Sequence, residues 1–161
     1  RGPAVIRPAR PDDAPAIGQI WNRIIRDTVF TFTTIEKDPE AIAASIAEGM
    51  PCQVATHADR VVGFVTAFQF RGGPGYAHTF EHSIHLIPEA QGRGLGRALM
   101  ATIEDDLRTR GVHSLFAGVS GENVAGVAFH AALGYVEVAR LPEVGWKSGR
   151  WHDLVLMQKR L

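Results

Sequence analysis

A glycine-rich turn over residues 91–96 carries the clearest chemical signal in this chain. The turn reads Gln91-Gly92-Arg93-Gly94-Leu95-Gly96, follows a short strand-like run and opens an amphipathic helix. Glycines let backbone N–H groups approach a ligand closely, and the first N–H groups of a helix have no partner within the helix. A turn of this kind at a helix N-terminus is an anion site. We therefore predict that a phosphate-bearing ligand binds here.

The spacing of the glycines narrows the choice of ligand. A dinucleotide fingerprint requires G-x-G-x-x-G, and a P-loop requires G-x-x-x-x-G-K-[ST]. This turn reads G-x-G-x-G and is followed by Arg97, so both patterns fit poorly. The non-functional alternative is a plain left-handed turn that leads into a helix.

The composition excludes several classes of protein. Seventeen basic and 17 acidic residues cancel within the 161 residues, which gives no electrostatic case for nucleic acid or an anionic membrane. Cys52 is the only cysteine, which excludes an internal disulfide and a multi-cysteine metal site. No apolar run approaches the ~20 residues of a membrane span. We expect one cytoplasmic domain over residues 1–161.

Hydrophobic periodicity predicts alternating helices and strands. Helices are expected from Pro11, from Asp38 to about Glu48, from about Gly92 to Arg110 and from Asn123 to Leu133. Strands are expected at 5–8, 53–57, 60–70, 82–87, 115–119, 135–141 and 152–158, with a loop over 142–151. This order predicts an α/β fold with a mixed sheet.

The strand before the glycine turn presents two different faces, because successive side chains of a strand point to opposite sides. One face carries Phe80, His82, Ile84 and Leu86. The other carries Glu81, Ser83 and His85. The candidate chemistry next to the turn therefore lies on a strand that runs directly into it.

Four segments together resemble the GNAT superfamily of N-acetyltransferases over nearly the whole chain. They are 80–84, the turn, Asn123 with 129–135, and 145–153. The turn matches Q/R-x-x-G-x-G/A, the pyrophosphate-binding turn that holds acetyl-CoA in that superfamily. Segment 145–153, with Glu81 and His130, is similar to the phosphinothricin and methionine sulfoximine N-acetyltransferase branch. The resemblance implies a mixed, mostly antiparallel twisted sheet with helices on both faces, splayed at its central strands.

The resemblance implies acetyl-CoA as co-substrate and no metal. Related enzymes splay two central strands, and the pantetheine arm fills the gap, so the backbone of 84–86 is expected to contact it and to hold the oxyanion. The implied cofactor contacts are Ile84, His85, Leu86, Gln91, Gly92, Arg93, Gly94, Leu95, Gly96, Arg97 and Asn123. Asn123 is also expected to cap the helix that it precedes.

Two side chains are implied to be catalytic. Acetyl transfer to an amine requires a group that takes the ammonium proton, and the resemblance implies Glu81, directly or through a water. The alternative is an outward-facing strand glutamate. His130 stands where many relatives carry a tyrosine that protonates the thiolate; it is either a proton or hydrogen-bond donor near the sulfur or a structural histidine.

The acceptor is implied to be a small amino-acid-like amine, and the branch implies a homodimer. Arg71 is the candidate that would grip a carboxylate, because a guanidinium binds it in bidentate fashion; a solvated loop arginine is the alternative. The other implied acceptor contacts are Phe30, Phe32, His82, Ser83 and Trp146. A polyamine, an aminoglycoside or a protein N-terminus remains an alternative acceptor.

Two rival functions come from different classes. Residues 78–82 match H-x-x-E-H, an inverted zinc-hydrolase motif. That chemistry requires a helix, whereas this segment alternates as a strand between Gly75 and Pro88. The second rival is a non-catalytic CoA-binding module, against which the presence of both Glu81 and His130 argues.

Overall fold

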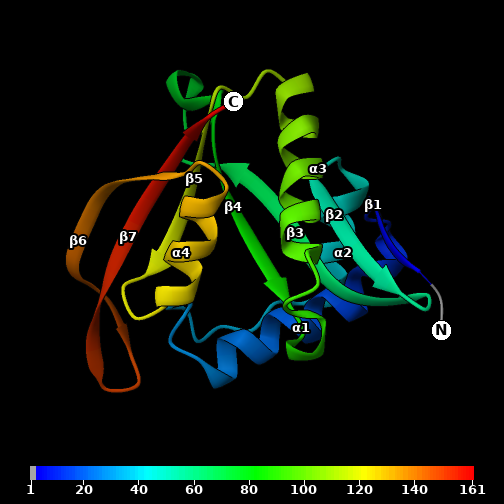
Figure 1. Cartoon of the computed structure of the whole chain (residues 1–161), viewed down its shortest axis with the longest axis horizontal. Coiled ribbons are helices and arrows are strands. Elements are labelled where there is room, and N and C mark those ends of the chain that lie inside the picture. The colour runs from blue at the N-terminus through cyan, green and yellow to red at the C-terminus, as the bar shows by residue number, and fades with distance from the viewer. Residues whose placement is uncertain (1–2) are drawn as a thin grey trace.

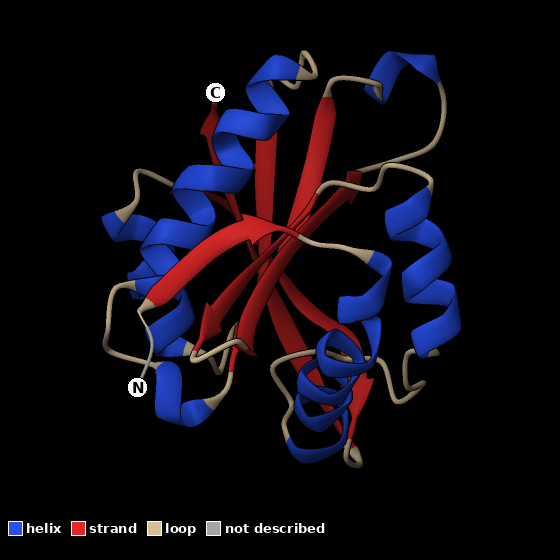
Figure 2. Cartoon of the chain, turned by 90° about the vertical axis from the view of Figure 1, so that its right-hand side faces the viewer, coloured by secondary structure: helices blue, strands red, loops and turns tan. Residues whose placement is uncertain are grey.

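The computed structural model describes residues 3–161, which form a seven-stranded sheet with helices on both faces (Figures 1 and 2). The strands are β1 (Ala4–Pro8), β2 (Cys52–His57), β3 (Arg60–Gln69), β4 (Thr79–Leu86), β5 (Ser114–Ser120), β6 (Val136–Lys147) and β7 (Arg150–Arg160). The helices are α1 (Ala14–Asp27), α2 (Pro39–Ala47), α3 (Leu95–Thr109) and α4 (Val124–Ala132). Short 3₁₀ turns cover Pro11–Asp13, Pro74–Tyr76 and Pro88–Ala90.

The sheet is mixed, as the element order predicts, and mostly antiparallel, as the resemblance implies. Its strand order is β1-β2-β3-β4-β5-β7-β6, and only the β4–β5 pair is parallel. A parallel pair requires a crossover connection, which α3 supplies here. The glycine turn and α3 therefore lie in the connection between the two central strands.

Each face of the sheet has its own apolar core. α3 packs Leu99, Ile103 and Leu107 against one face, and α4 adds Phe129 to the same core. On the other face α1 packs Ile17 and Ile20 against the sheet, together with α2. Because strand side chains alternate, β4 adds Phe80, Ile84 and Leu86 to the α3 core, and its odd-numbered residues face the α1 side.

Turn residues set where the helices begin and end. The Asp38 carboxylate accepts the Glu40 N–H at 3.0 Å and caps α2. α3 begins at Leu95, three residues later than the sequence suggests, because Gly94 has the left-handed φ of 77° and is its N-cap. Gly111, with φ of 82°, follows its end.

The expected loop over 142–151 is wrong. β6 continues to Lys147 and β7 starts at Arg150, so this segment forms the tip of a hairpin. Ser148 and Gly149 have φ of 54° and 75°, as a tight two-residue turn requires. Pro142 is tolerated because β6 is an edge strand and its pairing with β7 shifts register between Leu141 and Gly145.

Within residues 3–161, none of the helices has the length and apolar character needed to cross a membrane.

Candidate active site

β4 and β5 separate in the middle of the sheet. They pair only from Thr79 with Ser114 to His82 with Ala117. Beyond that point β4 stays paired to β3 and β5 stays paired to β7, so the two inner edges face each other without bonding. Figure 1 shows the two strands side by side at their starts and apart at their ends. The splay implied by the resemblance is therefore present.

A cavity of about 580 Å³ fills this divergence. Its walls come from β4, β5, the glycine turn, the first turn of α3, α4 and the end of α1 with the segment after it. The predicted site residues that line it are Phe30, Glu81, His82, Ser83, Ile84, His85, Leu86, Gln91, Gly92, Gly94, Leu95, Gly96, Arg97, Asn123 and His130. The structure thus brings most of the predicted side chains together.

The glycine turn is built as an anion site at one end of the cavity. Gly92 and Gly94 both have φ of 77°, a left-handed conformation that a residue with a Cβ adopts only with strain. Gly96 matters for packing instead, because a Cβ there would lie 3.0 Å from Cε1 of Phe129, and the glycine lets α4 close onto α3. The N–H groups of the first turn of α3 have no partner within the helix and are available to a ligand.

Asn123 caps α4 at the opposite wall. Its Oδ1 accepts the Gly126 N–H at 2.9 Å. A Cβ on Gly126 would lie 2.5 Å from Asn123 Nδ2, so a glycine at this position makes room for the cap. The cap predicted from the sequence is confirmed, and the side chain also lines the cavity.

Glu81 lies on the face of the sheet that α1 covers. It is directly opposite Phe68 of β3, and its neighbours on that face of β4 are Ser83 and His85. A Cβ on Gly118 of β5 would come within 2.9 Å of Glu81 Oε2, so this glycine opens the space that the carboxylate fills. Partial burial raises the pKa of Glu81 above its ordinary value.

The face below α4 holds a buried histidine pair. His82 and His130 are 4% and 6% exposed, and their Nε2 atoms lie 2.9 Å apart. His130 Nδ1 lies 2.8 Å from the Gly126 carbonyl oxygen. Burial lowers both pKa values, and neighbouring His130 helps to lower the pKa of His82 to about 3. Both rings are therefore neutral at pH 7.

Hydrogen-bond geometry assigns the tautomers of the pair. The Gly126 carbonyl can only accept, so His130 Nδ1 carries the proton of that ring. Its Nε2 then accepts from His82 Nε2–H. His82 Nδ1 is left as a buried lone pair with no partner among residues 3–161. Neutral His130 therefore has both nitrogens engaged and no proton free for a leaving group.

Four predicted site residues lie away from the cavity lining. The Arg71 guanidinium sits over the Tyr76 ring, 5.4 Å from its centroid. Trp146 is 55% exposed and packs edge-on against Trp151. The remaining two, Phe32 and Arg93, also stay outside the lining.

Sequence reasoning missed the cavity residues that β5 and the end of α1 supply. These are Ile24, Thr31, Ala117, Gly118 and Val119. Only Gly118 left a signal, because a glycine inside a strand often marks a close approach. The others look like ordinary core residues, and only the tertiary fold shows their position.

The H-x-x-E-H segment lacks the geometry of a zinc hydrolase. Glu81 and His82 lie on opposite faces of β4, and His78 precedes the strand with Nδ1 2.9 Å from the Gly111 carbonyl oxygen. Such a motif requires its ligands on one face of a helix. Across residues 3–161, no group of three or more His, Cys, Asp or Glu side chains is arranged to hold a metal ion.

Residues 17–135 match the acetyltransferase (GNAT) family. The chain is 36% identical to the L-amino acid N-acyltransferase MnaT of Escherichia coli, covering 97% of this chain and 93% of that protein. It is 34% identical to the L-methionine sulfoximine/L-methionine sulfone acetyltransferase of Salmonella typhimurium, covering 97% and 94%. It is also 34% identical to the phosphinothricin N-acetyltransferase of Alcaligenes faecalis, covering 97% and 82%.

Solved structures share this arrangement. yncA from Salmonella typhimurium, solved with its cofactor acetyl-CoA, superposes with a TM-score of 0.94 at 33% identity, over 99% of this chain and 95% of that one. A phosphinothricin acetyltransferase from Sinorhizobium meliloti in complex with acetyl-CoA gives a TM-score of 0.91 at 29% identity, over 98% and 88%.

The tautomers of the histidine pair can be tested by ¹⁵N NMR. Because burial lowers the pKa of His82 to about 3, its ring should remain neutral at pH 5.5, and the His130 ring should titrate below the ordinary histidine value of about 6.5. The proton should reside on Nδ1 of His130 and on Nε2 of His82. The denatured chain is the control, since both rings should then titrate near the ordinary value. A folded-state ring that titrates there, or the reverse tautomers, would contradict the assignment.

Proposed function

This chain belongs to the acetyltransferase (GNAT) family, and from that premise we propose that it moves acetyl from acetyl-CoA to a small amino-acid-like amine of the phosphinothricin or methionine sulfoximine type. The observation that carries the proposal is the divergence of β4 and β5 directly before the glycine turn. It supports binding of an extended cofactor arm between the strands with its pyrophosphate at the N-terminus of α3.

The cavity fits acetyl-CoA in its chemistry. Backbone groups of β4 beyond His82 lack strand partners on their inner edge and would pair with the amides of a pantetheine arm. Arg97 adds positive charge beside the glycine turn, where a pyrophosphate would lie. Acetyl-CoA supplies an activated thioester, and N–H groups on 84–86 are the candidate donors to the oxyanion.

Glu81 is the proposed base. It lies beside the end of the paired region, on the face where α1 and the segment after it leave room for an acceptor. The carboxylate would take the first proton from the substrate ammonium, directly or through a water. The freed amine lone pair would then form the new C–N bond as the C–S bond breaks. A pKa raised by burial suits a base that works near neutral pH.

His130 is proposed to act without donating its own proton. In the neutral pair, its Nδ1–H is bound to Gly126 and its Nε2 accepts from His82. The second ammonium proton of the substrate is therefore the proposed source for the leaving thiolate. His130 and His82 would orient α4 against the cavity and keep that side free of charge.

The acceptor class is supported by the relatives named above and by Arg71. Arg97 is the only arginine or lysine among the cavity-lining residues described here, and its position suits the cofactor rather than the acceptor. Arg71 lies two residues after the end of β3, the strand that pairs with β4, and within residues 3–161 it forms no salt bridge. We propose that it turns from Tyr76 to bind the substrate carboxylate.

A homodimer is the proposed assembly. Edge strand β6 and its neighbour β7 expose several apolar side chains to solvent. They are Val136, Val138, Val144, Trp146 and Trp151. A second copy of the chain would bury them, and sedimentation tests this directly. The cytoplasmic location expected from the sequence stays a prediction.

The cofactor assignment is tested by Gly94→Val. A β-branched residue at a φ of 77° would force the turn to change shape and would lose the backbone donors. Calorimetry should show that acetyl-CoA affinity falls at least about 100-fold, as expected when several charge-assisted bonds are lost. Gly49→Val is the matched control, because Gly49 has φ of 99° in open space after α2, away from the cavity. Unchanged acetyl-CoA affinity in Gly94→Val would show that the pyrophosphate does not bind at this turn.

The base is tested by Glu81→Gln. The change keeps the shape and removes the proton acceptor, so kcat should fall roughly 100- to 10,000-fold while acetyl-CoA affinity stays nearly constant. In the wild type, kcat/KM should fall as the pH drops through a Glu81 pKa above the ordinary value of about 4.3. That acid limb should vanish in Glu81→Gln. Wild-type turnover in the variant would show that another group takes the proton.

Gly118→Ala tests whether the position of the Glu81 carboxylate matters. The added Cβ would displace a carboxylate oxygen 2.9 Å away while leaving its chemistry intact. We expect kcat to fall at least about tenfold, because small misplacements of a catalytic group are costly. A variant with normal kcat would show that Glu81 works from another position.

The acceptor is tested with a panel of amines. Phosphinothricin, methionine sulfoximine and free amino acids should give higher kcat/KM than a polyamine, an aminoglycoside or a peptide N-terminus. Arg71→Ala should raise KM at least about tenfold for acceptors with a carboxylate and much less for a matched amine without one. Equal loss for both would make Arg71 structural. Acetylation of polyamines or peptides alone would show that the acceptor is not amino-acid-like. No turnover with any amine would favour a non-catalytic CoA-binding module.

A further inference from the structure

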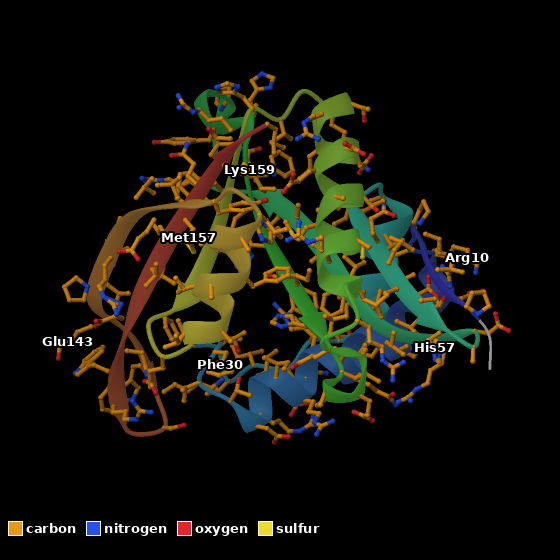
Figure 3. The ribbon with its side chains drawn as sticks, in the orientation of Figure 1. Arg10, Phe30, His57, Glu143, Met157 and Lys159 are labelled. Carbon is orange, nitrogen blue, oxygen red and sulfur yellow. The ribbon has the colours of Figure 1, made fainter. Side chains whose placement is uncertain are left out.

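The acceptor side of the cavity has a wall without regular structure. Segment 28–33, which we call the wall segment, follows α1 and supplies Phe30 and Thr31 to the lining. Figure 3 shows Phe30 near the lower end of α4. Main-chain groups of such a segment must find partners outside helices and strands. What holds the wall segment therefore decides the shape that an acceptor meets.

A buried lysine from the far end of the chain holds it. Lys147, the last residue of β6, is 5% exposed, and its Nζ donates to the Ile25 and Thr31 carbonyls at 2.7 and 2.8 Å. The last carbonyls of a helix lack partners within it and carry partial negative charge. One ammonium thus caps the end of α1 and binds the middle of the wall segment.

The same hairpin makes a second contact with the wall segment. The Phe32 ring stacks on the His152 ring, with centroids 5.5 Å apart and planes 19° apart. A Cβ on Gly145 would overlap Phe32, so this glycine makes the seat for the ring. His152 is in turn fixed between the Glu122 carboxylate and the Lys147 carbonyl, at 2.6 and 2.9 Å.

We propose that Lys147 is a positioning residue for the acceptor: its ammonium fixes the wall segment, so that Phe30 and Thr31 present one defined surface to the substrate. Thr31 carries a buried hydroxyl without a partner among residues 3–161, which is a polar group available at this wall. The inference rests on the proposed function. In this proposal segment 145–153 affects substrate recognition indirectly, because Lys147 holds the wall segment that the acceptor contacts.

The cofactor side does not share this dependence. It is built from β4, the glycine turn, α3 and α4, and Lys147 contacts none of them through its ammonium. Loss of the Lys147 ammonium should therefore weaken binding of the acceptor amine more than binding of acetyl-CoA. A general loss of stability would affect both.

Lys147→Met tests the proposal, because it keeps an unbranched side chain that ends one atom short of Nζ and removes the ammonium with both of its hydrogen bonds. The acceptor KM should rise about tenfold, while the acetyl-CoA Kd measured by calorimetry stays within about twofold. Amide hydrogen exchange of 28–33 should become faster, because the segment loses its partners. Gly145→Ala should raise the acceptor KM by a smaller factor, because it displaces Phe32, the second contact of the wall segment, while the ammonium still holds Thr31.

Lys159→Met is the matched control. Lys159 Nζ also donates to a protein group, Glu104 Oε1 at 2.7 Å, yet it lies near the opposite end of β7 from the wall segment (Figure 3). Its loss should lower the melting temperature and leave the acceptor KM unchanged. An equal rise of KM in this control, or a matching loss of acetyl-CoA affinity in Lys147→Met, would make Lys147 merely structural.

The exchange measurement separates this inference from the proposed function. A wild-type chain that acetylates no amine would overturn the function, and exchange at 28–33 would still decide whether Lys147 holds the wall segment. Unchanged exchange in folded Lys147→Met overturns the inference whatever the activity. If Lys147→Met does not fold, Lys147→Gln, which removes the charge and shortens the reach of the side chain, takes its place, and a normal acceptor KM with unchanged exchange at 28–33 overturns the proposal.

Discussion

Backbone hydrogen bonding at the centre of the sheet is the constraint on which the rest of the structure depends. β4 and β5 pair over four residues each and then separate, although a sheet normally keeps such groups paired. The outer neighbours β3 and β7 hold the diverging strands in place, so only the two inner edges remain open. A ligand with its own amide groups could satisfy those edges as a missing strand would, and this is the role proposed for the cofactor.

The divergence also opens the cavity to both faces of the sheet, and the alternation of β4 then separates two kinds of chemistry. Glu81 faces the α1 side, where its carboxylate is only partly buried and lines the cavity. His82, the next residue, faces α4 and is sealed in a neutral pair with His130. Two consecutive residues thus place an ionisable carboxylate on one face of the sheet and a neutral histidine pair on the other.

Local patterns in the sequence predicted the parts of the fold that local forces determine. The glycine turn, the alternation of β4 and the stripe of α3 follow from backbone freedom and from periods of 2 and 3.6 residues. Pro142 and Gly145 misled the same reasoning, because on an edge strand they form an irregularity in the pairing rather than a loop. The His82–His130 and Lys147–Ile25 contacts span 48 and 122 residues and leave no periodic signal.

That difference in range explains why the sequence indicates a family more readily than a substrate. The proposed cofactor side is assembled mainly from residues within 84–97 and 123–133, two continuous stretches whose spacing can be read directly. The acceptor side joins the end of α1 to a hairpin near the other end of the chain, through a buried ammonium and a stacked ring. Changes at either partner can alter the wall without altering the glycine turn. On the proposed function, acceptor choice would depend on contacts that become visible only when the fold brings the two segments together.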